Sequence, residues 1–214
     1  MEERLAKVCA RTGRPRDSIT LLAVSKVFPP SAIAEAYALG LREFGENYVQ
    51  EFEGKFPDVK DLPGARFHFI GHLQSNKARR AAQLFTTIQT VDSEKLARRL
   101  NDAATPLDIY LEVKLSEEDS KAGCPPEELG ALVSAVRAMP HLTLRGLMTM
   151  PPWSEDAELS RPYFRRLAEL AREHGLPGLS MGMSHDFEVA IEEGATLIRV
   201  GTALFGKRRK PAAT

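Results

Sequence analysis

The sequence lacks the patterns that mark a metal-binding protein. It has only two cysteines, Cys9 and Cys124, which lie far apart and do not have the spacing of a zinc site. None of its five histidines pairs with another at the spacing of a helical metal motif; they are His68, His72, His141, His174 and His185. We therefore expect no metal site, and the low cysteine content favours a reducing, cytoplasmic location.

The sequence also lacks an excess of charge and any long apolar run. Lysine plus arginine and aspartate plus glutamate each number 29, so the formal net charge is zero and no overall basic field favours nucleic acid. The longest apolar runs, 20–24 and 144–150, are far shorter than the roughly 20 residues of a membrane-spanning helix. No secretory leader precedes the first charged residues, and the basic segment 207–210 is typical of a solvated terminus. We expect a soluble protein with neither a nucleic-acid nor a membrane partner.

What the sequence does contain is a regular alternation of short apolar runs and amphipathic stretches. Helix signals include Ser93 in the position of an N-cap and a periodic stretch from about Asp156 to Glu173 that ends near Gly175. Eight runs have the length and composition of buried strands: Leu21–Ser25, Arg42–Gly45, Phe67–Ile70, Thr87–Val91, Ile109–Val113, Leu144–Met148, Leu179–Gly182 and Leu197–Val200.

Eight strands separated by helices predict a parallel sheet of the α/β class, which needs both faces covered. We predict a single (β/α)8 TIM-type barrel that spans residues 1–214 as one domain. An open doubly wound sheet is the alternative, but Lys26–Pro30 after the first strand contains no glycine-rich dinucleotide motif. An additional N-terminal helix is expected in the first dozen residues, with Leu5, Val8 and Cys9 on one side. Such barrels typically have about 250 residues, so this chain is short.

Lys26 is the first candidate for chemistry, because it follows the first strand and active sites of such barrels lie at the carboxyl ends of the strands. It could be an ordinary surface lysine. Sheltered by Val24, Val27 and Phe28, however, its amine could lose solvent and have a lowered pKa, as Schiff-base chemistry requires.

The segments after the seventh and eighth strands are the second candidate, because barrels of this type often bind phosphate there. Ser184 precedes a periodic stretch around 187–191 and could be its N-cap, a position that also suits an anion. Gly201 would let a phosphate approach the backbone, and Thr202 adds a second hydroxyl.

Arg199 interrupts an apolar strand and lies on the same side of it as Gly201. A buried guanidinium needs a partner, either a structural salt bridge or a bound ligand. The remaining candidates are Glu46 and Asn47 after the second strand, and the segment 71–77 with His72 after the third. Asn47 could instead cap the next helix, and His72 could simply line a loop.

Several of these residues fall in motifs that resemble one family. The motifs are Ala-Val-Ser-Lys (23–26), Phe-Gly-Glu-Asn-Tyr (44–48), His-Phe-Ile-Gly (68–71) followed by Leu-Gln-Ser-Asn-Lys, Ser-Lys-Ala-Gly (120–123), Arg-Gly-Leu-Met (145–148), Leu-Ser-Met-Gly-Met-Ser (179–184) and Arg-Val-Gly-Thr-Ala-Leu-Phe-Gly (199–206). In this order they resemble the pyridoxal 5'-phosphate homeostasis protein family, the YggS-type proteins, whose fold is like the N-terminal barrel of alanine racemase. The likeness spans roughly 21–206.

The resemblance implies that pyridoxal 5'-phosphate (PLP) is the cofactor and that Lys26 holds it as an internal aldimine. It further implies that Arg199 faces the pyridine nitrogen and that Asn47 lies near the cofactor. Ser184, Gly201 and Thr202 would bind the phosphate. Two departures from the family pattern affect the rim: Lys114 stands where asparagine is common, and His185 stands where an acidic residue is frequent, although Asp186 remains.

The implied role of Arg199 has a chemical consequence. Arginine is already a full cation and cannot accept a proton from the ring, so it favours a weaker electron sink than an aspartate partner would. Racemisation also needs acid and base groups on both faces of the substrate carbon, and Lys26 serves only one. No tyrosine lies in a motif that would place it on the other face; the four are Tyr37, Tyr48, Tyr110 and Tyr163.

We therefore expect a monomeric protein of PLP homeostasis or delivery, with little or no turnover and with apo PLP-dependent enzymes as recipients. The alternatives are a PLP-dependent amino-acid racemase and, outside this family, a Schiff-base aldolase that acts on a phosphosugar. Only Ala203–Thr214 follow the last strand motif, too few residues for the β-domain of alanine racemases, and this favours cofactor binding without racemisation.

Overall fold

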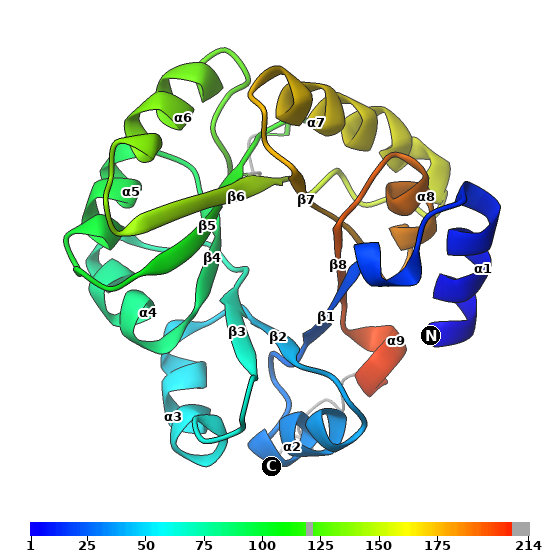
Figure 1. Ribbon diagram of the computed structural model, residues 1–214, viewed down its shortest axis with the longest axis horizontal. Helices are drawn as coiled ribbons and strands as arrows, with labels where there is room; N and C mark the ends of the chain where they lie inside the picture. Colours follow the sequence, from blue (N-terminus) through cyan, green and yellow to red (C-terminus); the bar gives the residue numbers. More distant parts are fainter. Residues whose placement is uncertain (119–121, 207–214) are drawn as a thin grey trace.

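A computed structural model describes residues 1–118 and 122–206. Its strands form a closed barrel in which each pairs in parallel with the next and the last pairs with the first (Figure 1). They are β1 (Thr20–Val24), β2 (Glu43–Glu46), β3 (Arg66–Phe69), β4 (Thr87–Val91), β5 (Leu107–Glu112), β6 (Leu142–Met148), β7 (Gly178–Met183) and β8 (Leu197–Val200). The predicted (β/α)8 barrel is confirmed, and the open sheet is excluded because closure leaves no edge strand.

Helices surround the barrel, and an additional one lies outside this ring. That helix, α1 (Glu2–Thr12), packs against α8 and buries Leu5, Val8 and Cys9, as the sequence predicts (Figure 1). The others are α2 (Pro30–Ala38), α3 (Val49–Val59), α4 (Ala78–Leu84), α5 (Glu94–Asn101), α6 (Leu129–Arg137), α7 (Arg161–Glu173), α8 (Phe187–Glu192) and α9 (Thr202–Phe205). Within the described ranges, no helix is long and apolar enough to cross a membrane.

One predicted helix is divided in the structure. The stretch from Asp156 onward first forms a 3-10 turn, Ala157–Ser160, and α7 begins only at Arg161 with a proline in its first turn. Proline suits a helix start because its missing N–H is not needed there. The N-cap role of Ser93 is confirmed, since its hydroxyl accepts a hydrogen bond from the Leu96 N–H.

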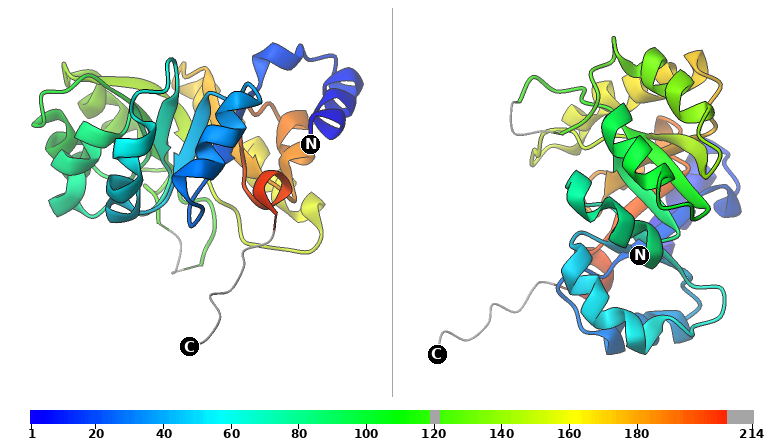
Figure 2. Two further views of the ribbon diagram at one scale, coloured as in Figure 1. Left: turned by 90° about the horizontal axis from the view of Figure 1, so that it is seen from below. Right: turned by 90° about the vertical axis from the view of Figure 1, so that its left-hand side faces the viewer.

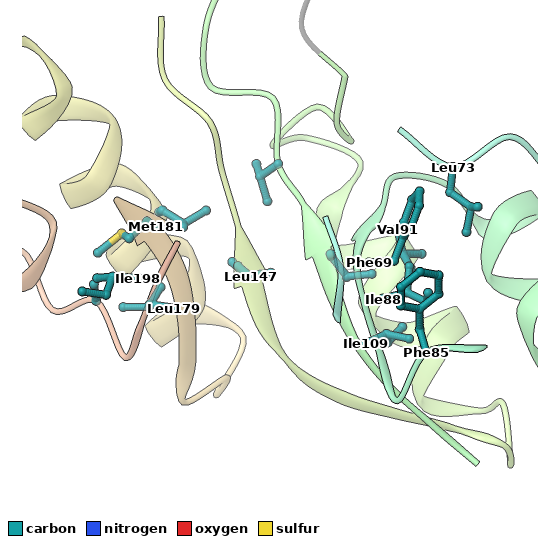
Figure 3. Close-up of a cluster of buried hydrophobic side chains, with 14 of the residues drawn as sticks. Phe69, Leu73, Phe85, Ile88, Val91, Ile109, Leu147, Leu179, Met181 and Ile198 are labelled. Carbon is teal, nitrogen blue, oxygen red and sulfur yellow. The ribbon is translucent and has the colours of Figure 1, made fainter. Parts of the chain in front are cut away.

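The main hydrophobic core lies between the barrel and the helices. Outward-facing strand residues supply the inner half, and Figure 3 shows Ile88 and Ile109 of adjacent strands beside Phe85. The Phe85 ring stacks on Phe52 of α3 with centroids 4.7 Å apart. Burial of each such side chain contributes about 1.5–3 kcal/mol, so this layer fixes the helices against the strands.

The interior of the barrel has a different composition. A small apolar group there is separate from the main core and consists of Leu22, Val24, Ile70 and Leu197. Polar side chains share the interior, because they alternate along their strands with outward-facing core residues. They include His68, Gln89, Ser180 and Arg199, all buried.

The closure of the barrel places the first and last strands side by side. β1 and β8 pair in register, with Ala23 beside Val200, so Lys26 and Gly201 follow adjacent strand ends. In the left view of Figure 2, α9 (red) lies at the end of the barrel toward which the strand arrowheads point. The candidate residues from both ends of the sequence therefore share one face.

Candidate functional site

A pocket of about 320 Å³ lies at the carboxyl ends of the strands. The six residues that the family resemblance assigns to the cofactor all line it: Lys26, Asn47, Ser184, Arg199, Gly201 and Thr202. Met150, Trp153, Met183 and His185 also line the pocket. Of these, His185 was noted only as a departure from the family pattern, and Met150 and Trp153 carry no motif that would have marked them.

Lys26 lies half-buried on a turn after β1, with Val24 and Phe28 beside it in the pocket wall. The expectation that Val27 shelters the amine is wrong, because Val27 is 52% exposed and does not line the pocket. Its backbone has a φ of 64°, a left-handed conformation that β-branched residues rarely adopt. The Val27 N–H donates to Glu51 Oε1 at 2.6 Å, and this bond holds the turn in its strained form.

A buried polar cluster supports this turn from below. Glu46 is fully buried beneath the Lys26 turn and does not line the pocket, so it is not the rim residue that the sequence suggested. Its Oε1 accepts hydrogen bonds from Ser25 Oγ at 2.8 Å and from Lys55 Nζ at 2.9 Å. Lys55 Nζ also donates to the Ser25 carbonyl at 3.0 Å and lies 2.6 Å from Glu51 Oε1.

Lys55 is the member of this cluster that the sequence reading missed. It lies on the inner face of α3 with Val49, Phe52 and Val59, and a lysine at an apolar position of a helix is the signal that could have found it. Burial raises the pKa of Glu46, and the neighbouring Lys55 ammonium opposes that rise. The cluster ties the strand end of β1 to α3, so it sets where the Lys26 turn begins.

Arg199 is buried, and the atoms that its guanidinium contacts are neutral. It donates to the Ser180 carbonyl at 2.8 Å, to Ser180 Oγ at 2.7 Å and to the Thr149 carbonyl at 2.9 Å. The carboxylates of Asp186 and Glu112 also favour its charged form, so the structure contains acidic partners for it besides any bound ligand. Burial lowers the pKa of Arg199 to about 10, which still leaves a full cation at neutral pH.

Ser184 connects the ends of β7 and β8. Its Oγ accepts from the Gly201 N–H at 3.3 Å and from the Ala203 N–H at 3.4 Å, so the hydroxyl lies at the start of α9. The alternative role as N-cap of the next helix is wrong, because Asp186 occupies that position. The Asp186 carboxylate instead accepts from the Met183 N–H at 2.7 Å and fixes the turn before α8.

Two glycines near these strand ends have different reasons to be glycine. Gly182 has a φ of 89°, and a Cβ there would meet the Ala190 Cβ at 2.5 Å, so packing itself requires it. At Gly201 an added Cβ would meet the Val24 Cβ at 3.5 Å, an ordinary contact. The protein's own packing therefore does not require glycine at 201, and the backbone there is open toward the pocket.

Asn47 lines the pocket and carries an unsatisfied atom. Its Oδ1 is buried and has no hydrogen-bond partner among the described residues. The alternative role as a helix cap is not observed, since Tyr48 is the N-cap of α3. A buried amide oxygen without a partner costs roughly 1–3 kcal/mol, which a ligand donor or water would recover.

The other rim candidates do not join this pocket. His72 is exposed and lines a separate hollow of about 210 Å³ beside Tyr48 and Lys77. The basic segment 207–210 and part of the 120–123 motif lie outside the described residues. In the described ranges, no group of three or more histidine, cysteine or acidic side chains could hold a metal ion.

Comparisons with known proteins identify the family of this chain. The family model for the N-terminal domain of alanine racemase matches residues 2–209. The pyridoxal phosphate homeostasis protein of Pseudomonas aeruginosa is 48% identical over 96% of this chain and 95% of its own length. The chain belongs to the pyridoxal phosphate homeostasis protein family. The family's protein in Aquifex aeolicus is 45% identical over 97% of this chain and 95% of its own length.

Among solved structures, PipY of Synechococcus elongatus with PLP bound superposes with a TM-score of 0.84. It is 41% identical, and the match covers 94% of this chain and all of that one. The resemblance noted from the sequence motifs is therefore confirmed over nearly the whole barrel.

Proposed function

We propose that this chain binds PLP in the pocket at the carboxyl ends of the strands and serves to hold and deliver it, with little or no turnover of its own. One observation carries the proposal: the same pocket is lined by the Lys26 amine, by the buried Arg199 cation and by the open backbone at Gly201. The names of the relatives and the PLP-bound state of PipY support it.

The residues present fit this cofactor. Asn47 Oδ1 is buried and has no donor among the residues that the structure describes, so the pocket has a polar atom that a ligand could satisfy. The backbone at Gly201 is open without any packing need for glycine, which suits the close approach of a phosphate. The Ser184 hydroxyl joins the Gly201 amide to the start of α9, and Thr202 adds a hydroxyl at the same point.

Each residue then has a definite part. Ser184, Gly201 and Thr202 would hold the phosphate, Arg199 would face the ring nitrogen, and Lys26 Nζ would form the covalent bond. When bound, PLP supplies an electron-withdrawing ring that can stabilise negative charge on an attached amino acid. Arg199 has no proton-accepting atom, so it would favour an unprotonated ring nitrogen and would weaken that effect.

The racemase alternative needs a second proton-transfer group opposite Lys26. The four tyrosines lie in α2, at the start of α3, in β5 and in α7, and the described pocket lining contains none of them. His185 does line the pocket, with its ring 6.4 Å from that of Trp153, so it is the imidazole whose proton transfer should be measured.

The wider biological role is also a proposal. We place the protein in the cytoplasm as a monomer of one domain, residues 1–214, which passes PLP to apo PLP-dependent enzymes. The strand order supports the single domain, because β8 completes the barrel by pairing with β1.

The decisive experiment is visible absorbance of the purified protein with and without added PLP. The wild-type protein should gain a visible band and Lys26→Ala should not, while Lys77→Ala, a lysine outside this pocket, should behave as wild type. Borohydride reduction and peptide mass analysis should then locate the modification on Lys26. A Lys26→Ala variant that keeps the band would refute the assignment.

A separate measurement distinguishes carrier from racemase. Exchange of the α-proton of several amino acids in deuterated water should be slow with the wild-type protein. Rapid exchange that is lost in Lys26→Ala or His185→Gln would establish turnover and contradict the carrier role.

A further inference from the structure

A chain of polar side chains, all buried except Glu43, crosses the barrel from its lower mouth, the end opposite the pocket, to the pocket. Barrels of this class are usually filled by apolar side chains, and a buried polar group is costly without partners. Here four strands other than β8 each contribute one polar member that faces inward or lies at the lower mouth. They are Glu43 of β2, His68 of β3, Gln89 of β4 and Ser180 of β7, and the chain ends at Arg199 of β8.

Short hydrogen bonds connect these residues without a gap. Glu43 Oε2 lies 2.5 Å from His68 Nε2, and His68 Nδ1 lies 2.8 Å from Gln89 Nε2. Gln89 Oε1 lies 2.6 Å from Ser180 Oγ, which in turn lies 2.7 Å from Arg199 NH1. Gln89 and Ser180 are fully buried, so bulk water does not compete with the middle of the chain.

With the Gln89 amide oriented as the structure has it, the donors and acceptors in this chain form one consistent sequence. A guanidinium only donates, so Ser180 Oγ accepts from Arg199, and in the orientation that the Gln89 amide has here the hydroxyl donates to Gln89 Oε1. The Gln89 amide N–H then points at His68 Nδ1, which must accept. The His68 proton therefore sits on Nε2 and is donated to the Glu43 carboxylate. The Gln89 amide on one side and the Glu43 carboxylate on the other thus favour this tautomer of His68.

The orientation of Gln89 also affects the contacts of Arg199. Gln89 is held by His68 in the one orientation that offers its carbonyl oxygen to Ser180. If that oxygen were absent, the Ser180 hydroxyl would be free to rotate, and it would no longer be a fixed acceptor for the Arg199 guanidinium. The Ser180 and Thr149 carbonyls would remain, so Arg199 would stay buried but with a looser orientation.

We propose that Gln89, oriented by His68, is a positioning residue that sets the direction in which Arg199 faces the cofactor ring. The proposal rests on the proposed function, since it assigns a second layer of residues to the same site. Gln89 and His68 do not line the pocket, so both act only through Ser180 and Arg199.

The experiment compares Gln89→Met with Thr87→Val, a matched control on the same strand. Thr87 is buried and its Oγ1 has no hydrogen-bond partner among the described residues, so Thr87→Val removes a polar atom from the barrel without breaking the chain. Gln89→Met keeps the side-chain length and removes both of its hydrogen bonds. We expect Gln89→Met to weaken PLP binding on the order of tenfold and to shift the visible band, and Thr87→Val to do neither.

A second comparison shows whether Gln89 acts through Ser180. Ser180→Ala should give a loss and a band shift similar to Gln89→Met, and the double variant should be no worse than Ser180→Ala alone. Because Ser180→Ala removes only one oxygen, it carries the test should Gln89→Met fail to fold. Nitrogen-15 spectra of the Arg199 guanidinium, recorded without PLP, should change in both variants.

The outcomes separate this proposal from the proposed function. If the wild-type protein forms no visible band, the proposed function fails. If the wild type binds PLP while folded Gln89→Met matches Thr87→Val in affinity, band position and Arg199 signals, the positioning role is refuted. Fully additive losses in the double variant would also overturn it.

Discussion

Replacing Lys55 by methionine tests the buried pair beneath the Lys26 turn. The Lys55 ammonium lies 2.9 Å from Oε1 of the fully buried Glu46, whose Oε2 has no partner among the described residues. At an effective dielectric constant of about 20, attraction over this distance is worth about 6 kcal/mol, and desolvation of both ions offsets much of it. Removing one partner leaves a buried charge uncompensated, so Lys55→Met should lower the free energy of unfolding by about 3–5 kcal/mol at neutral pH.

The pH dependence of this loss is the sharper part of the prediction. Burial raises the pKa of Glu46, so the folded state binds more protons than the unfolded state in the window above the unfolded pKa. The contribution of Glu46 to the free energy of unfolding is therefore fully present below about pH 4, and it is lost as pH rises toward the pKa of Glu46 in the folded state. Lys55→Met removes the cation that opposes this shift, so the window widens and the loss should be largest near about pH 8 and smaller near about pH 5.

Urea unfolding at both pH values measures the effect. Lys60→Met is the matched control, because Lys60 is an exposed lysine at the end of the same helix. The double variant Glu46→Gln, Lys55→Met should recover part of the lost stability, since no buried charge remains. A loss that is equal at both pH values, or a double variant less stable than Lys55→Met, would refute the reasoning.

Two further predictions concern two glycines and a buried thiol. Gly182→Ala should destabilise the fold by about 2–5 kcal/mol in thermal unfolding, because Gly182 has a positive φ and an added Cβ would collide with Ala190. Gly201→Ala should change the free energy of unfolding by only about 0.5 kcal/mol, while it weakens PLP binding in a titration. Equal stability losses in the two variants would contradict this distinction. Burial raises the pKa of Cys124 to about 11, so only about one thiol in a thousand is ionised at pH 8. Native protein should therefore react with a thiol reagent far more slowly than protein in urea. Fast labelling of Cys124 in native protein would contradict the raised pKa.

Much of this structure could be predicted from local patterns in the sequence. Most strands contain a short apolar run, and the rule that barrel sites lie after the strands was enough to find Lys26, Ser184 and Gly201, which line one pocket. Strand bounds deviate by at most two residues, because strands end where pairing ends and apolar patterns do not mark that point sharply.

The supporting residues were harder to predict because their roles depend on contacts between distant segments. Val27 is apolar, yet the strained turn directs it outward, and only the Glu51 contact across 24 positions explains why. Gln89 and Ser180 are unremarkable in their strands, and their pairing across 91 positions follows from closure of the barrel. Local periodicity carries no information about such pairs.

The pairing of β1 with β8 makes the pocket a property of the completed barrel. Lys26 emerges from a ribosome long before Gly201 and Thr202, and the two halves of the site meet only when the last strand joins the first. A growing chain therefore cannot contact a ligand with both halves of the site at once, and a ligand that binds both halves stabilises the paired strands by mass action. Separation of β1 from β8 would therefore part Lys26 from Gly201 and Thr202 and divide the site.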